Sequence, residues 1–476
     1  MLGPGRYLLG VAEIGILVGI AWLGAARVRA RLVPRLEGAP AHLATAVLAL
    51  ALLVWVAELL GTVSLFEPVP YLLAVAVVGL VLRVTIQEAP TTPSASDVVG
   101  VSWIVTAGAL VVAGVAVVHF AGGVETRLGT GMTGFDSTWY HGPFAAGFFQ
   151  TGNTMDLHFI APQFLAWFYP ANGEIFHGVG MLAFGRDVLS PLLNLGWFVG
   201  CLVACWCIGR PYRVAPWSLA LGAIALSVPA FADQAGEARN DIVGVFFLLA
   251  AVALALNSWL GRGEGERAQS VGALVVVGLA AGLAAGTKLN FLLPAAVLVL
   301  GLALISPRGL RARAFGVSAL AALAGGGYWY LRNLAHTGNP LPWVDDLGPI
   351  TLPAPDQALG GREAHSVLSY LTDGAVWSDW FLPGLHDGLW LFWPVLLPAA
   401  LAGLVLATAS IRSERRDPFL ALAGTVGLAT VLAWLVAPTS ASGPEGMPRG
   451  FESGFRYLAP ALVLGLALLP ATRPLG

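Results

Sequence analysis

The chain has 476 residues, of which 57% are hydrophobic and only 11% are charged, and its mean hydropathy is +0.77. This composition excludes an ordinary water-soluble globular protein and indicates a polytopic membrane protein. The formal net charge is −2, and no basic tract is interleaved with aromatic residues, which excludes a nucleic-acid-binding function.

Apolar runs recur along the whole chain. A helix needs about 20 residues to cross a hydrocarbon layer of roughly 30 Å, and this rule predicts about 13 spans. They are expected near residues 7–26, 42–62, 68–87, 98–120, 188–208, 215–231, 241–260, 271–285, 289–305, 314–331, 387–410, 418–437 and 457–471. The sequence therefore predicts an all-α fold, a bundle of transmembrane helices with extracytoplasmic loops.

The first three spans form the predicted N-terminal part of the molecule. They carry no motif and end in a Pro-, Ser- and Thr-rich segment at 89–94, which is typical of a loop. We therefore expect an accessory transmembrane region at 1–97 and a catalytic transmembrane core at 98–476.

The loops alternate in charge along the chain. Arginines gather in the short loops after the spans that end near 26, 208, 260, 305 and 410. The positive-inside bias makes these loops cytoplasmic. The remaining loops, 121–187, 232–240, 332–386 and 438–456, are then extracytoplasmic, and they include the longest ones.

The first large outer loop, 121–187, contains the segment Gly134-Phe135-Asp136-Ser137-Thr138-Trp139-Tyr140-His141. An ionisable residue at a membrane boundary is a candidate functional residue. Two amphipathic stretches follow, near 142–151 and 157–168; both are too short to cross and suit helices that lie in the interface. The structural alternative is that Asp136 caps the short helix that follows it.

Cationic side chains lie at the ends of spans on the same predicted side. Lys288 is the only lysine of the chain, and Arg332 and Arg456 also lie at span ends. A charge within the membrane costs about 2.5–3.5 kcal/mol on insertion scales unless water or a partner is close. A lipid phosphate is one such partner. Lys288 could instead snorkel to the interface, and either arginine could pair with a loop carboxylate.

Further polar candidates are Glu174, Glu237, Asp241 and His141. Glu237 and Asp241 lie at the start of a span, where a carboxylate favours the helix N-terminus; one of them could instead hold the acceptor or a metal. His141 could bind phosphate or orient a sugar, although a lone interfacial histidine is more often structural.

The segment Asp136-Ser137-Thr138-Trp139-Tyr140-His141-Gly142-Pro143 resembles the Asp-containing loop of the GT-C glycosyltransferases, in the branch related to the protein O-mannosyltransferases. Enzymes of this branch often have adjacent acids in the loop, whereas Ser137 follows Asp136 here. Segments that are similar in order, over roughly residues 98–471, are Tyr169-Pro170-Ala171-Asn172-Gly173-Glu174, Glu237-Ala238-Arg239-Asn240-Asp241, Gly282-Leu283-Ala284-Ala285-Gly286-Thr287-Lys288, Trp329-Tyr330-Leu331-Arg332-Asn333 with Gly338-Asn339-Pro340, and Arg456-Tyr457-Leu458-Ala459-Pro460.

The resemblance implies an enzyme of the cell membrane that takes a sugar from a polyprenyl-phosphate donor. The acceptor would be an extracytoplasmic glycan, lipid or protein, and transfer would invert the anomeric carbon. Asp136 would be the catalytic general base. The predicted substrate-binding residues are His141, Glu174, Glu237, Asp241, Lys288, Arg332 and Arg456.

Some GT-C enzymes use a divalent metal, but no His-x-x-x-His or paired-acid spacing is found here, so we expect neither a metal nor another cofactor. The alternative function is a transporter or flippase of a lipid-linked glycan. Such a protein should place charges or broken helices near mid-span and often has two related halves.

Overall fold

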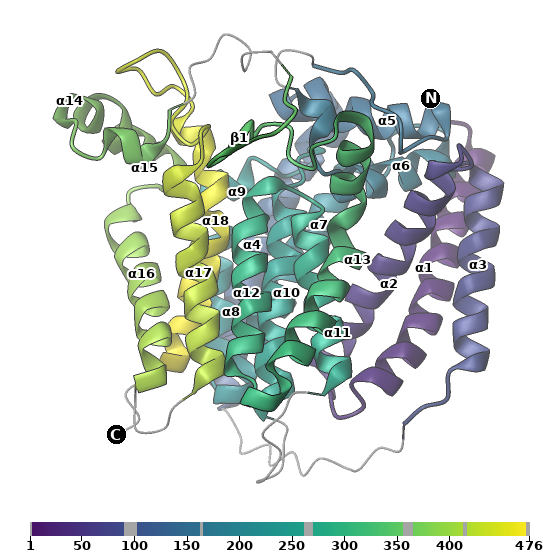
Figure 1. The fold of residues 1–476 in the computed structure, drawn as a ribbon, viewed down its shortest axis with the longest axis horizontal. Coiled ribbons are helices and arrows are strands. Elements are labelled where there is room, and N and C mark those ends of the chain that lie inside the picture. Colours follow the sequence, from purple (N-terminus) through teal and green to yellow (C-terminus); the bar gives the residue numbers. More distant parts are fainter. Residues whose placement is uncertain are drawn as a thin grey trace.

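The structure is a computed structural model that describes residues 2–89, 102–161, 165–260, 270–355, 365–412 and 417–472. Over these ranges the chain forms a bundle of roughly parallel helices (Figure 1). Nine of the described helices are long and apolar enough to cross a membrane, and three shorter apolar helices, α8, α11 and α12, lie among them. The predicted all-α transmembrane bundle is confirmed, and the number of about 13 spans stays a prediction.

The helices are α1 (Pro4–Leu32), α2 (Ala39–Thr62), α3 (Pro68–Thr85), α4 (Trp103–Thr130), η1 (Ser137–His141), α5 (Gly142–Thr151), η3 (Ala166–Phe168), α6 (Asn172–Phe184), α7 (Ser190–Gly209), α8 (Ala215–Leu226), α9 (Pro229–Ala232), α10 (Asp241–Leu260), α11 (Val271–Ala285), η5 (Leu289–Phe291), α12 (Leu292–Ile305), η6 (Arg308–Leu310), α13 (Arg311–Thr337), α14 (Gly374–Val376), η8 (Trp377–Phe381), α15 (Leu382–Leu389), α16 (Trp393–Ala409), α17 (Pro418–Val436) and α18 (Phe451–Leu468). Two short strands, β1 (Asp346–Leu347) and β2 (Ile350–Thr351), pair antiparallel.

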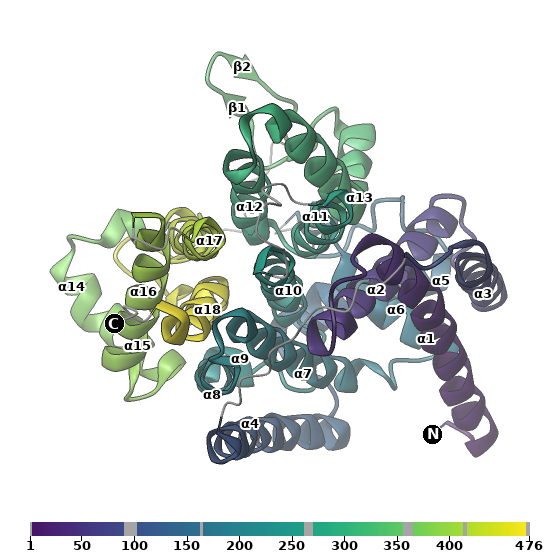
Figure 2. The same ribbon diagram turned by 90° about the horizontal axis from the view of Figure 1, so that it is seen from below.

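Helix α10 lies at the centre of the bundle. Figure 2 shows α1–α3 on one side of it and α16–α18 on the other. Its most apolar window is 89% buried inside the protein, whereas the corresponding windows of α3 and α4 are 17% and 22% buried. A helix that is hydrophobic all round and buried belongs to a core, and apolar faces left exposed by the protein suit lipid.

The close contact between α11 and α13 depends on glycine. A Cβ atom on Gly326 would lie 2.2 Å from the carbonyl oxygen of Gly282 and 2.6 Å from the amide nitrogen of Gly286. No side chain fits there, so the two backbones pack directly against each other. This contact fixes the end of α11 against the middle of α13, and Lys288 follows α11.

The predicted loop boundaries need correction at several helix ends. Helix α4 continues to Thr130 and α13 to Thr337, so the loops after them begin later than predicted. Near the end of α4, the hydroxyls of Thr126 and Thr130 donate to carbonyl oxygens four residues earlier. These bonds satisfy the polar side chains within the helix, so α4 continues beyond its apolar run. The predicted run 387–410 is divided between α15 and α16 at Trp390, whose φ is 59°.

The first large loop differs in part from its prediction. The stretch near 142–151 is helical, as α5. The helix predicted near 157–168 is wrong over 157–161 and reduced to the turn η3, while 162–164 lie outside the described residues. Proline at position 162 explains this, because a proline disfavours helical backbone at the residue before it. The fully buried helix α6 follows within the same loop.

Candidate functional site

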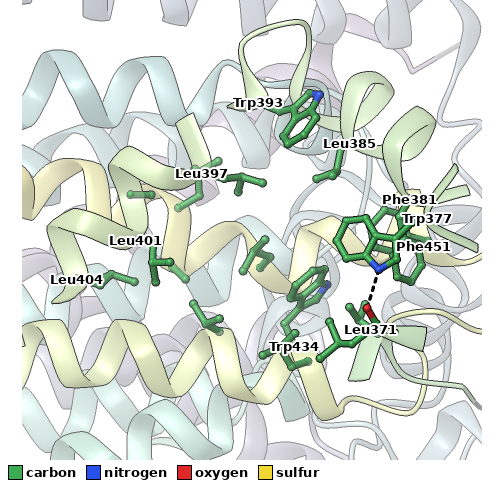
Figure 3. A pocket seen from close by; sticks show the side chains of 17 residues that line it. Leu371, Trp377, Phe381, Leu385, Trp393, Leu397, Leu401, Leu404, Trp434 and Phe451 are labelled. Atoms are coloured by element: carbon green, nitrogen blue, oxygen red, sulfur yellow. Dashed lines mark hydrogen bonds between the residues drawn. The ribbon is translucent and has the colours of Figure 1, made fainter. Parts of the chain in front are cut away.

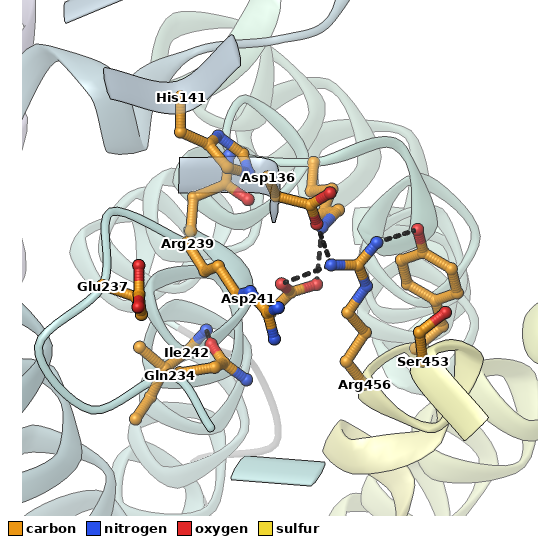
Figure 4. A network of polar contacts seen from close by, with 12 residues as sticks. Asp136, His141, Gln234, Glu237, Arg239, Asp241, Ile242, Ser453 and Arg456 are labelled. Carbon is orange, nitrogen blue, oxygen red and sulfur yellow. Dashed lines mark hydrogen bonds and ion pairs between the residues drawn. The ribbon is translucent and has the colours of Figure 1, made fainter. Parts of the chain in front are cut away.

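Charged residues from four distant segments meet at one end of the bundle, and Figure 4 shows three of them, Asp136, Asp241 and Arg456. Asp136 precedes η1, Asp241 is the first residue of α10, Lys288 lies between α11 and η5, and Arg456 lies near the start of α18. Asp136, Lys288 and Arg456 come together as predicted, with Asp241 as a second carboxylate. We call these four residues the charged cluster.

The charged cluster is a set of ion pairs. Arg456 Nη1 binds Asp136 Oδ2 and lies 4.0 Å from Asp241 Oδ2. Lys288 Nζ donates to Asp241 Oδ1 at 2.6 Å. Asp136 is 7% exposed and Asp241 1% exposed. Two carboxylates and two cations therefore neutralise one another in a place with little water, where charge pairs interact more strongly than at a surface.

The backbone around Asp136 is held by the segment before α10. Glu237 Oε1 accepts hydrogen bonds from the amides of Thr133 and Gly134, at 3.1 and 2.9 Å, and lies 2.8 Å from Arg127 Nε. The amide of Ala238 donates to the hydroxyl of Ser137 at 2.9 Å. Glu237, predicted to bind substrate, is thus engaged in fixing the loop that carries Asp136.

Asp136 is ionised in this environment. Burial would raise its pKa, but the charges of Arg456, Lys288, His141 and Arg239 outweigh burial and hold the pKa well below its ordinary value. Its side chain makes no hydrogen bond to the amides of the following turn. The capping alternative for Asp136 is therefore wrong, because its side chain pairs with Arg456 instead. Sequence reasoning missed Arg239, whose only signal was its place between Glu237 and Asp241.

A second buried network lies beside the cluster. His141 Nδ1 pairs with Glu174 Oε1, and Asn240 Nδ2 donates to the same oxygen at 3.1 Å and to the carbonyl of Thr287 at 3.0 Å. His141 is 1% exposed and its Nε2 atom is enclosed with no hydrogen-bond partner among the described residues. Burial, with a smaller effect from the charge of His141, lowers the pKa of nearby His177 to about 3.

Aromatic residues missed by the sequence reasoning surround the cations. The ring of Tyr457 lies 5.2 Å from Lys288 Nζ and 5.1 Å from the guanidinium carbon of Arg456, and its hydroxyl accepts from Arg456 Nη2 at 3.1 Å. Burial first, and then the charge of Asp136, raises the pKa of Tyr140. Burial first, and then the charges of Tyr457 and Asp136, raise the pKa of Tyr169. The sequence signal was that each of these three tyrosines lies inside one of the quoted motifs.

Arg332 does not join the charged cluster. It is 2% exposed, its Nη2 atom donates to the carbonyls of Trp167 at 2.5 Å and Tyr169 at 3.3 Å, and its guanidinium lies 4.8 Å from the ring of Trp329. The neighbouring Asn333 donates to the carbonyl of Phe168 at 2.8 Å. Both residues hold the backbone of 167–169, and the role of Arg332 toward a substrate stays a prediction.

An apolar cavity of about 290 Å³ lies between α16, α17, α18 and the segment 367–385. Figure 3 shows Trp393, Leu397, Leu401 and Trp434 lining it. Helix α18 contributes Phe451 and Leu458 to the cavity and Arg456 to the charged cluster. Among the residues that the structure describes, no three His, Cys, Asp or Glu side chains gather to hold a metal ion.

Neither a family model nor a curated protein matches this chain. The crystal structure of ArnT from Cupriavidus metallidurans, bound to undecaprenyl phosphate, is similar with a TM-score of 0.49 and 19% sequence identity. The match covers 76% of this chain and 60% of that chain, so it spans less than two thirds of the length of ArnT. This similarity does not assign the chain to a family.

Proposed function

We propose that the protein is a membrane glycosyltransferase of the GT-C type that takes a sugar from a polyprenyl-phosphate donor. The observation that carries the proposal is the charged cluster, in which a buried carboxylate and two cations from distant segments meet at one end of a transmembrane bundle. Transfer from a lipid phosphate needs a base for the acceptor and cations for the leaving group.

In the proposed reaction, an acceptor hydroxyl oxygen attacks the anomeric carbon from the face opposite the phosphate. The bond between the anomeric carbon and the phosphate oxygen breaks, and the sugar inverts. Asp136 takes the hydroxyl proton. Lys288 and Arg456 hold the negative charge that develops on the polyprenyl phosphate, with the guanidinium suited to two phosphate oxygens at once.

Asp241 has a positioning role in this scheme. Its carboxylate binds Lys288 at 2.6 Å and lies 4.0 Å from Arg456, so it keeps both cations at the same place before the donor arrives. Because it is 1% exposed at the start of α10, it is placed to hold cations rather than to meet an acceptor.

The apolar cavity offers a place for part of the lipid. A polyprenyl chain is purely hydrocarbon, and the cavity is lined by Leu, Trp and Phe side chains of helices in the membrane region. Because α18 borders both the cavity and the charged cluster, a donor with its phosphate at Arg456 could place its first isoprene units along this helix.

The charge pattern supports an active site outside the cytoplasm. Thr154 belongs to the loop that carries Asp136, and its amide donates to the carbonyl of Gly61 near the end of α2. The end of α2 therefore lies on the side of the charged cluster, and the turn between α1 and α2 lies at the opposite end of the bundle. Arg29 and Arg31 lie in the last turn of α1, and Arg210 donates to the carbonyl of Glu37 in that turn at 2.7 Å. Arginines therefore gather at the end opposite the charged cluster, and the positive-inside bias makes that end cytoplasmic.

The test is sugar transfer by the purified protein in lipid nanodiscs. Radiolabelled polyprenyl-phosphate mannose, arabinose and galactose are offered with a cell-envelope extract as acceptor. We expect transfer from one donor, a loss of about 10²–10⁴-fold in Asp136→Asn, and a raised KM in Lys288→Met. The exposed acid in Asp379→Asn serves as control. For the alternative function, the protein is reconstituted into sealed proteoliposomes, where movement of intact lipid-linked sugar across the bilayer without transfer would favour a flippase.

A further inference from the structure

We propose that Tyr140, Tyr169 and Trp343 form the subsite for the sugar ring of the donor, a role given to none of them so far. The inference rests on the proposed function, and it names the part of the donor that the charged cluster leaves unaccounted for. We call these three residues the aromatic wall.

The aromatic wall is continuous and begins beside Asp136. Tyr140 follows Asp136 by one helical turn in η1, and its ring centroid lies 5.8 Å from that of Tyr169, at an interplanar angle of 74°. The ring of Tyr169 lies 5.3 Å from that of Trp343, at 35°. The wall thus leads from the proposed base into the loop after α13.

The phenol groups of the wall have no hydrogen-bond partner within the described protein. Among the described residues, neither the hydroxyl of Tyr140 nor that of Tyr169 has a hydrogen-bond partner, and neither oxygen is fully enclosed. A buried tyrosine usually finds a partner for its hydroxyl. The charge of Asp136 acts on both phenols, so both hydroxyls lie in the electrostatic neighbourhood of the reacting groups.

The wall is held in place by buried polar residues. Arg332 and Asn333 bind the carbonyls of 167–169, which fixes the backbone of Tyr169. Asn339 Nδ2 donates to the carbonyls of Val344 at 2.8 Å and Pro353 at 2.9 Å, which fixes the loop of Trp343. Buried carbonyls need donors in any fold, and here the same donors hold the wall in a fixed position, from which a binding site gains.

The chemistry of the wall fits a sugar. The faces of a sugar ring carry C–H bonds that pack on aromatic rings, and its hydroxyls accept hydrogen bonds from phenols. A phosphate alone would need cations, which the wall lacks and the charged cluster supplies. A sugar held on Tyr140 and Tyr169 would lie next to Asp136, between the phosphate site and the loop that carries Trp343.

The test compares polyprenyl phosphate with its sugar-loaded forms, which carry the sugar in place of one ionisable phosphate oxygen. Binding of polyprenyl phosphate and of polyprenyl-phosphate mannose, arabinose or galactose to the full chain in nanodiscs is measured for the wild type and for Tyr140→Phe, Tyr169→Phe and Tyr169→Leu. We expect each Phe variant to bind the preferred sugar-loaded lipid about 5- to 10-fold more weakly and Tyr169→Leu more weakly still. Binding of the sugar-free lipid should stay within about twofold of the wild type.

Tyr212→Phe is the matched control, because it removes a phenol that donates to Asp417 at the opposite end of the bundle. Unfolding midpoints of all variants identify a folding defect, and two independent positions keep the test open if one variant fails to fold. Equal losses for both lipids, or unchanged binding of the sugar-loaded lipid in both Phe variants, would overturn the aromatic wall. Failure of the wild type to bind either lipid would overturn the proposed function as well.

Discussion

At the residue scale, the central fact is that the proposed base is already paired. Asp136 binds Arg456, and the same guanidinium is proposed to bind the donor phosphate. The two anions therefore compete for one cation. A donor that draws Arg456 away from Asp136 would also release the carboxylate to accept a proton, so donor binding and activation of the base are coupled through Arg456.

This competition makes an unusual prediction for Asp136→Asn. The variant should lose transfer activity, yet bind sugar-free polyprenyl phosphate about 3- to 10-fold more tightly, since Arg456 no longer has an anionic partner. Equilibrium binding to nanodisc-embedded protein measures the effect. Asp379→Asn, which removes an exposed acid, should change neither quantity. Weaker phosphate binding in Asp136→Asn would show that the carboxylate supports the donor rather than competing with it.

The ionisation of Asp136 predicts that kcat/KM does not fall at acidic pH because of this residue. Its pKa in the folded protein lies below the ordinary value near 3.8, so the base is charged at every pH above that value. Stability from this depressed pKa is present above the unfolded pKa and is lost as pH falls through the folded one. We expect kcat/KM to show no acid limb from Asp136 above about pH 5. An acid limb above pH 5 that shifts in Asp136→Glu would contradict this.

At the element scale, the sequence predicted the helices well and their ends poorly. Long apolar runs such as 241–260 and 271–285 agree with α10 and α11, because the length and hydrophobicity of a span are written into its composition. The ends of the helices are harder to predict, because a helix such as α4 or α13 can continue through polar residues beyond its apolar run. Helix α6 was missed because its thirteen residues are too few for a span and its burial comes from neighbouring helices.

Arg332 of α13 binds the backbone of the segment 167–169, and we call this contact the clamp. Removing Arg332 should therefore lower the stability of the folded protein. In Arg332→Met the carbonyls of Trp167 and Tyr169 lose a buried charged donor, which should lower the free energy of unfolding by about 1.5–3 kcal/mol. Denaturant titration in mixed micelles measures it. Arg186→Met, at an exposed arginine, is the control and should stay within about 0.5 kcal/mol. Equal stabilities of the two variants would contradict the clamp.

The contact of α11 with α13 predicts opposite outcomes for two glycines of one helix. Gly326→Ala places a Cβ against the backbone of α11, and separating the helices should cost about 1–3 kcal/mol. Gly316→Ala has no atom within 4 Å of its new Cβ and should be neutral or stabilising by up to about 1 kcal/mol. Unfolding midpoints of both variants provide the comparison, and a stable Gly326→Ala would mean that the two helices are not locked together.

At the scale of the whole molecule, the sequence predicts three charged residues that the fold brings together, but not the partner of each one. Asp136, Lys288 and Arg456 are predicted as charges at span ends, and tertiary packing brings them together with Asp241. Sequence could not show that Glu237 would hold the loop before Asp136, or that Arg332 would bind carbonyls, because partners separated by a hundred residues or more are set by the fold. The tyrosines were passed over because aromatic residues are ordinary at a membrane interface.

The orientation of the whole bundle is the property on which an extracytoplasmic acceptor depends, and cysteine labelling tests it. Helix α12 begins next to Lys288 and ends at Ile305, so Gly309 in η6 lies at the arginine-rich end, whereas η8 packs on α18, the helix whose start carries Arg456. We expect a membrane-impermeant maleimide to label Asp379→Cys in intact cells and to label Gly309→Cys only after the membrane is opened. The native Cys201, Cys205 and Cys207 are buried and should give little background. Labelling of Gly309→Cys in intact cells would place the charged cluster on the cytoplasmic side, and the acceptor would then be a cytoplasmic molecule.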